Sequence, residues 1–197
     1  TVTHKLPSPF LTMATQNPVE QEGTYPLPEA QVDRFMLKVL LDYPQRSEEA
    51  LILERMAHPD VEASAVTVTS IDDILKAREW VDKIYLDEKI AEYILDIVFA
   101  TRTDRHDQLS ERQKDADLSD LDDLIQYGAS PRATISLAVA AKAAAFLAGR
   151  AYVMPQDLKN IAPDVLRHRI VPTYEAEAEN LTTTDLIQRL LNELRTP

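Results

Sequence analysis

Three polar residues of this sequence have side chains suited to phosphate chemistry, namely Asn17, Arg34 and Arg132. An amide can donate a hydrogen bond to a phosphoryl oxygen and accept one from water without any change of charge. A guanidinium offers a planar set of donors that matches the oxygens of a phosphate group. Because the three residues lie far apart in the sequence, they can serve one site only if the elements that carry them fold together.

Asn17 follows an apolar run at residues 10–14, which is short enough for a buried parallel strand. Pro18 ends this run, because proline cannot continue a strand ladder and pushes the residue before it into an extended or turn conformation. The Asn17 amide would then lie at the carboxyl end of a strand, where open α/β sheets bind their ligands. A polar residue in this position is more often a simple turn former, so the spacing alone leaves both interpretations open.

Arg34 lies at the end of a short predicted helix at residues 27–35, in which Pro28 suits the first turn. The apolar run at residues 35–41 follows and predicts a second strand. An exposed arginine at a helix end is already favoured by the helix dipole. The position of Arg34 therefore does not by itself establish a role in catalysis.

Arg132 falls in the first turn of a predicted alanine-rich helix at residues 131–148. Ser130 is a good N-cap, Pro131 is a good first residue, and Gly149 is a natural terminator. A cation near the positive end of a helix dipole costs roughly 0.3–1 kcal/mol, which a bound anion would offset. The position indicates a phosphate sensor, unless the side chain turns into solvent or pairs with a nearby acidic residue.

The remaining sequence predicts a mostly α-helical protein in two parts. Residues 1–44 alternate strand, turn, short helix and strand, which is the pattern of part of an α/β core. Residues 45–197 are predicted to form a helical domain, with the boundary at residues 43–45. Helices are expected to start at Ser47, Ser70, Asp87 and Pro155, with a restart at Pro163, a β-prone run at residues 65–69 and a last helix at residues 184–194.

Composition excludes several classes of function. A net charge of −12 argues against broad nucleic-acid binding, which needs clustered lysine and arginine. The chain has no cysteine, and its four histidines lack the spacing of a metal site. No apolar run is long enough to cross a bilayer, so we expect a soluble, cytoplasmic protein. The acidic stretch at residues 104–123 is expected to be a solvated loop and helix start, or else a surface for docking a partner.

Four sequence motifs resemble those of the MoxR family of AAA+ ATPases: ATQNP (14–18), EGTYPLPEAQVDRF (22–35), YGASPRA (127–133) and AGRAYVMPQDL (148–158). The resemblance implies an ATPase that binds ATP and Mg²⁺ between the subunits of a ring, expected to be a hexamer. It also implies chaperone-like remodelling or maturation of client proteins, beside partners with von Willebrand factor A domains. On this basis residues 1–44 would be the last part of the AAA+ core, and residues 45–197 would be its helical lid.

The same resemblance implies a role for each of the three polar residues. Asn17 matches sensor 1, which orients the attacking water and reads the terminal phosphate. Arg34 matches the arginine finger, which reaches the nucleotide of the neighbouring subunit. Arg132 matches sensor 2, acting in its own subunit or across the interface. We expect Asp33 to orient Arg34 or to hold the interface, and the basic cluster at residues 167–169 to pack the lid.

Two signatures of the family are missing from the sequence. The chain has only three glycines, and none can build a GxxxxGK[ST] phosphate loop, the Walker A motif. The Walker B acidic pair is also missing, because the run VLLDYP at residues 39–44 has Tyr43 and Pro44 where a catalytic glutamate would be needed. We therefore expect a carboxyl-terminal piece of a longer ATPase that is inactive alone. The alternatives are a non-catalytic adaptor and a helical scaffold that binds partners through its acidic surface.

Overall fold

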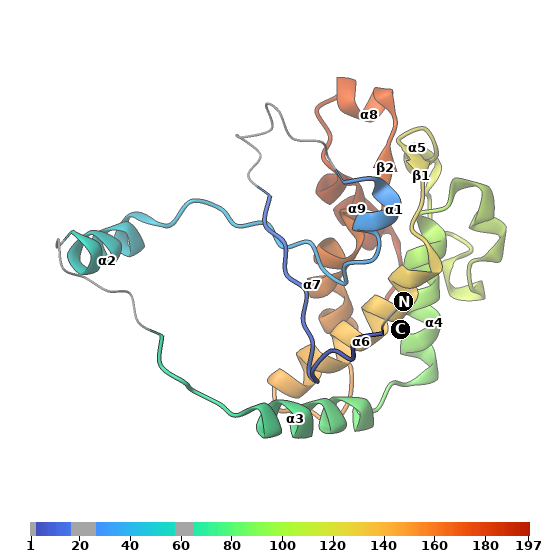
Figure 1. Ribbon diagram of the computed structural model, residues 1–197. Coiled ribbons are helices and arrows are strands. Elements are labelled where there is room, and N and C mark those ends of the chain that lie inside the picture. Colours follow the sequence, from blue (N-terminus) through green and yellow to red (C-terminus); the bar gives the residue numbers. More distant parts are fainter. Residues whose placement is uncertain (1–2, 17–26, 58–64) are drawn as a thin grey trace.

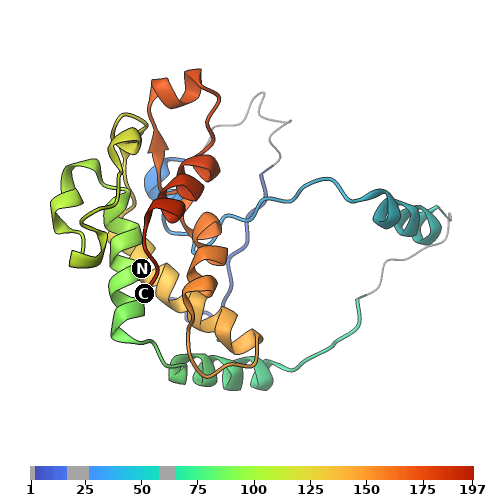
Figure 2. The same ribbon diagram turned by 180° about the vertical axis from the view of Figure 1, so that it is seen from behind.

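The computed structural model describes residues 3–16, 27–57 and 65–197 (Figures 1 and 2). Within these ranges the elements follow one another along the chain as α1 (Glu29–Val32), α2 (Arg46–Met56), α3 (Ile71–Lys83), α4 (Glu88–Ala100), the 3-10 helices η2 (Thr103–Gln108) and η3 (Glu111–Gln113), α5 (Ser119–Asp122), β1 (Ile125–Tyr127), α6 (Pro131–Leu147), α7 (Pro155–Leu166), β2 (Val171–Pro172), α8 (Tyr174–Ala178) and α9 (Thr183–Glu193). The prediction of a mostly α-helical protein is confirmed.

Helices α4, α6, α7 and α9 pack around one hydrophobic core, and α3 lies across one end of α6 (Figure 1). The core forms because apolar residues recur every three or four positions along each helix and so share one face. Its largest fully buried apolar side chains are Tyr93, Ile94, Ile97, Leu137, Leu158, Leu166, Leu186, Ile187, Leu190 and Leu191.

Several predicted helix ends are confirmed because their caps are local. The Ser70 hydroxyl accepts from the Asp73 amide at 3.1 Å, and the Asp87 carboxylate accepts from the Lys89 amide at 2.9 Å. Ser130 caps α6 in the same way, through the Arg132 amide at 3.3 Å. Gly149 follows α6 with a φ of 70°, a left-handed conformation that glycine adopts without the steric cost of a Cβ.

Two local predictions were wrong. Helix α2 begins at Arg46, capped by Gln45 and not by Ser47, because the Gln45 amide donates to the Glu48 carboxylate at 2.7 Å in a capping box. Pro163 lies inside α7 and does not restart it. The buried stripe of α7 continues through Ala162, Val165 and Leu166, and packing of this stripe holds the helix together across the proline.

The predicted strands of the amino-terminal part do not form. Residues 10–14 and 35–41 have no strand structure, and the side chains of Leu11 and Leu41 are 78% and 93% exposed. The β-prone run at residues 65–69 is likewise irregular. A parallel strand needs neighbours to bind its backbone groups, and in the described residues no strand lies alongside these runs. The apolar pattern was present, but the pairing was not.

A small sheet that the sequence did not predict brings the segment that leads to α6 close to the segment that follows α7. Strand β1 pairs antiparallel with β2, with Ile125 opposite Pro172 and Tyr127 opposite Val171. The chain leaving β1 leads directly to Ser130 and the start of α6, while the chain entering β2 comes from the turn after α7. Along the described part of the chain, none of the helices has the length and apolar character needed to cross a membrane.

Candidate functional site

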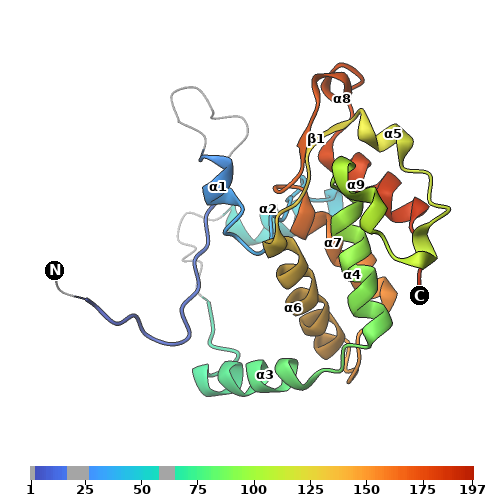
Figure 3. The ribbon, with the colours of Figure 1, turned by 90° about the vertical axis from the view of Figure 1, so that its right-hand side faces the viewer.

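The segment after α1 lies across the start of α6, as the side view in Figure 3 shows. Asp33 is the residue that caps the carboxyl end of α1, and its carboxylate is bound by side chains from the carboxyl-terminal half of the chain. The Ser130 hydroxyl donates to both carboxylate oxygens, at 3.0 and 3.1 Å. Arg132 donates from Nη1 at 2.9 Å, and Arg169 donates from Nε at 3.1 Å.

The negative charge of Asp33 is therefore neutralised by two arginines, Arg132 and Arg169. Burial by itself would raise the pKa of Asp33, but the hydrogen bonds from Arg132 and Ser130 and the charge of Arg169 outweigh it and hold the pKa below its ordinary value. The side chain of Asp33 is 16% exposed, that of Arg132 57% and that of Arg169 only 1%. The Arg132 contact is thus open to exchange with solvent species, whereas the Arg169 contact is enclosed.

Arg169 also binds the backbone of the segment around Arg34. Its Nη2 donates to the carbonyl oxygens of Asp33 at 3.1 Å and Phe35 at 2.6 Å. Its Nη1 donates to the Met36 carbonyl at 3.1 Å and also contacts the Val165 carbonyl in the last turn of α7. One buried guanidinium therefore joins α7 to the residues on both sides of Arg34.

The two residues before Arg169 extend the same attachment. His168 Nε2 donates to the Phe35 carbonyl at 3.0 Å, and Arg167 Nη1 donates to the Lys38 carbonyl at 3.2 Å. The Lys38 amide donates in turn to the Asp164 carbonyl at 2.8 Å. Burial, together with the charges of Arg169 and Lys38, lowers the pKa of His168 below its ordinary value. The basic cluster packs against the chain after Arg34, as expected of a structural role.

The structure places two of the three sequence-predicted residues near one another. Arg132 pairs with Asp33, so the nearby acid weighed from the sequence is present. Arg34 directly follows Asp33, and its side chain is exposed, with no hydrogen bond or ion pair to another described residue. Asn17 lies outside the described residues. The sequence did not reveal Arg169 as a member of the site, and its only signal was the expectation that the basic cluster packs the lid.

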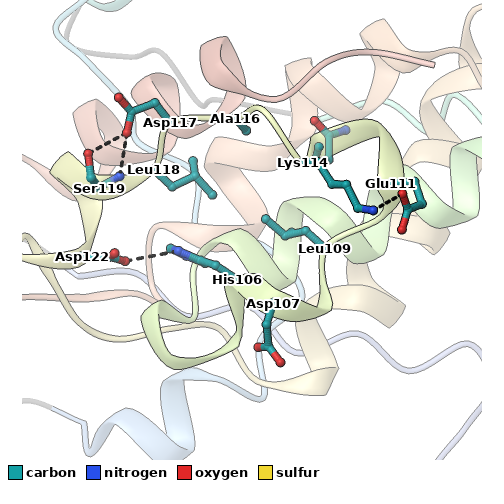
Figure 4. Close-up of a pocket in the computed structure, with 11 residues that line it drawn as sticks. His106, Asp107, Leu109, Glu111, Lys114, Ala116, Asp117, Leu118, Ser119 and Asp122 are labelled. Carbon is teal, nitrogen blue, oxygen red and sulfur yellow. Dashed lines mark hydrogen bonds and ion pairs between the residues drawn. The ribbon is translucent and has the colours of Figure 1, made fainter.

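A separate hollow lies in the acidic stretch, with a volume of about 500 Å³ (Figure 4). It is lined by η2, η3, α5 and the chain between η3 and α5. Within this lining His106 pairs with Asp122 at 3.3 Å and Lys114 pairs with Glu111. None of the residues that bind Asp33 lines it. Within residues 3–16, 27–57 and 65–197, no group of three or more histidine or acidic side chains is placed to hold a metal ion.

Comparison with known proteins identifies the family of this chain. The profile of the AAA lid domain matches residues 117–190, and that of the ATPases associated with various cellular activities matches residues 1–37. The chain is 40% identical to Chaperone MoxR1 of Mycobacterium tuberculosis over 195 residues, which cover 99% of this chain and 49% of that protein. The chain belongs to the MoxR family of AAA+ proteins.

The chain is also similar to two further proteins. The chain is 39% identical over 197 residues to the uncharacterized protein YeaC of Bacillus subtilis, covering 99% of the chain and 55% of that protein. A crystal structure of a candidate ATPase from Cytophaga hutchinsonii superposes with a TM-score of 0.86 at 42% identity, covering 98% of this chain and 56% of that one. The chain thus spans about half the length of the two curated relatives, MoxR1 and YeaC.

The family match confirms the predicted fold class, part of an AAA+ core followed by a helical lid. It also shows what the Asp33 contacts connect. Asp33 and Arg34 lie in the part matched by the AAA profile, while Ser130, Arg132 and Arg169 lie in the part matched by the lid profile. The ion pairs of Asp33 therefore join the core part of a MoxR protein to its lid.

Proposed function

We propose that this chain is the sensor and lid part of a MoxR-type AAA+ ATPase that uses ATP and Mg²⁺ to remodel or mature client proteins. The observation that carries the proposal is the Asp33–Arg132 pair, which brings the cation at the start of α6 beside the residue that precedes Arg34. Ring assembly, as a hexamer, partners with von Willebrand factor A domains and a cytoplasmic location belong to the same proposal.

The start of α6 is chemically suited to a phosphate group. Ser130, Arg132 and Arg169 already hold an oxyanion there, the carboxylate of Asp33. Phosphate oxygens accept the same hydrogen bonds, and the positive end of the α6 dipole favours negative charge. Arg132, which is the exposed member of the group, would move from Asp33 to the terminal phosphate of ATP.

The other roles follow from the chemistry of the residues. Asn17 would orient the attacking water and donate to the terminal phosphate. Arg34, with an exposed side chain, would neutralise charge that develops on the nucleotide of a neighbouring subunit. Bound Mg²⁺ would neutralise the phosphates during the reaction. The sequence contains no GxxxxGK[ST] loop, so this chain would contact only the terminal phosphate.

The test is ATP hydrolysis by a protein that carries this chain together with a phosphate loop. We expect Arg34→Ala to lower the turnover rate by about 10³–10⁵ while ATP still binds, because a finger acts mainly in the transition state. Arg132→Ala should weaken ATP binding. The 197-residue chain alone should show no multiple turnovers. Full turnover by the Arg34→Ala protein would overturn the finger role of Arg34. No hydrolysis by the unaltered protein would overturn the ATPase proposal and favour a non-catalytic adaptor.

A further inference from the structure

We propose that Arg169 is a positioning residue for Arg34. Because Arg169 belongs to the lid, the position of the lid would then determine the position of the arginine finger. This inference rests on the proposed function, because it assigns Arg34 to catalysis. The observation behind it is independent of that function: the Arg169 guanidinium binds the backbone immediately before and after Arg34 and leaves the Arg34 side chain exposed.

The geometry of these contacts explains why an arginine is needed. Three nitrogens of one rigid plane reach the Asp33 carboxylate and the carbonyl oxygens of Asp33, Phe35 and Met36. Such a set of bonds fixes both the position and the direction of the chain, because the donors cannot move independently. A lysine places all its donors on a single atom and cannot span the same acceptors.

Arg169 is itself firmly attached to the lid. It lies in the turn between α7 and β2, its amide donates to the Leu166 carbonyl at 2.8 Å, and its side chain is 1% exposed. The Val165 carbonyl and, at 3.4 Å, the Ser136 hydroxyl accept from the same guanidinium. A movement of the end of α7 would therefore carry the backbone of Arg34 with it.

The roles of Arg132 and Arg169 are separate in this arrangement. Both bind Asp33, but only Arg132 is exposed enough to transfer to a phosphate group. When Arg132 leaves, Asp33 keeps its contact with Arg169, so the backbone at Arg34 stays held. Loss of Arg132 should therefore affect nucleotide affinity, whereas loss of Arg169 should affect the finger and hence the turnover rate.

Limited trypsin digestion of this chain tests the backbone contact without any ATPase activity. Trypsin cleaves after arginine, and we expect the Arg34–Phe35 bond to be protected while its flanking carbonyls are bound by Arg169. We expect Arg169→Lys to speed cleavage at this bond roughly tenfold, because cleavage follows the population of the locally open segment. Cleavage after Arg189, in the core-packed helix α9, serves as the internal reference for unfolding of the lid.

Arg150→Lys is the matched control. Arg150 makes a two-bond ion pair with Asp157, at 2.9 and 2.6 Å, and binds the Tyr152 carbonyl at 3.1 Å. The Arg150→Lys variant loses a comparable network of arginine hydrogen bonds in the lid. The described contacts of Arg150, however, do not reach residues 33–36. The rate at Arg34 should stay unchanged in this variant. An unchanged rate in Arg169→Lys, or an equal increase at Arg34 and Arg189, would overturn the proposal.

The catalytic consequence is measured in the protein that carries a phosphate loop. Arg169→Lys should lower kcat at least tenfold with KM for ATP changed less than threefold, and should add little to the loss caused by Arg34→Ala. An unchanged kcat, or fully additive losses, would overturn the positioning role. If neither the wild-type protein nor any variant hydrolyses ATP, the proposed function fails. The digestion experiment would still show whether Arg169 holds the backbone on both sides of Arg34.

Discussion

The Arg132 guanidinium donates to the Asp33 carboxylate at 2.9 Å, across 99 residues of sequence. Asp33 immediately precedes Arg34, and the same carboxylate accepts from the buried Arg169. The contact therefore connects the exposed cation at the start of α6 with the segment that carries the proposed finger. Its strength and its dependence on charge can be measured in the isolated chain.

Replacing Asp33 with asparagine should lower the free energy of unfolding at pH 7 by about 2 kcal/mol, since it leaves the buried Arg169 without its ionic partner. The pKa of Asp33 is held below 3.8, so its charge stabilises the fold above that pH and stops doing so as the pH falls through the lowered pKa. Urea unfolding should thus show a difference between wild type and Asp33→Asn that shrinks below pH 4.

Asp42→Asn is the control for that measurement, because the Asp42 carboxylate accepts from the amide of its neighbour Tyr43 and is exposed. Its effect on unfolding should stay below about 0.5 kcal/mol. Equal losses in the two variants, or an Asp33→Asn loss that does not depend on pH, would show that the ion pairs of Asp33 contribute nothing specific.

Protonation of His168 should weaken the attachment of residues 35–38 to the lid. Burial lowers the pKa of His168 below 6.5, so the folded chain binds fewer protons at this site than the unfolded chain as the pH falls through 6.5. The free energy of unfolding should therefore decrease between pH 7.5 and 5.5. In His168→Gln, whose amide can still donate to the Phe35 carbonyl, this decrease should be smaller.

Urea midpoints at the two pH values measure the effect, and the other three histidines remain in both proteins as a common background. An equal decrease in wild type and His168→Gln would rule out His168 as its source. A larger decrease in the variant would contradict the direction of the pKa shift.

Gly128 should tolerate no side chain. A Cβ added there would lie 2.2 Å from the carbonyl oxygen of Thr101 and 2.7 Å from its carbon. The same loop is fixed by the Ala129 amide, which donates to the Thr101 hydroxyl at 2.9 Å, and it leads directly to Ser130. We expect Gly128→Ala to lower the free energy of unfolding by about 3 kcal/mol, because a packed backbone must move.

Gly149→Ala is the comparison, because a Cβ there meets nothing within 4 Å and only its φ of +70° opposes it. That strain should cost about 1–2 kcal/mol. Urea unfolding of both variants separates crowding from strain. A smaller loss in Gly128→Ala than in Gly149→Ala would mean that the loop before Ser130 yields easily and does not set the start of α6.

Local sequence patterns predicted the helical part well, because helix caps depend on residues only two or three positions apart. Ser70, Asp87 and Ser130 cap the helices expected of them, and Gly149 follows α6 as predicted. Where another residue made the capping box, the helix began at a different place, as at Gln45. The four MoxR-like motifs were enough to indicate the family.

Tertiary structure alone decided which predicted strands form and which charged residues meet at Asp33. The apolar runs at residues 10–14 and 35–41 could be recognised, but a strand exists only when another strand binds its backbone. The partnership of Asp33 with Arg132 and Arg169 spans 99 and 136 residues. A single sequence shows which charges are available, whereas the small sheet β1–β2 and the packing of α6 on α7 determine which of them meet.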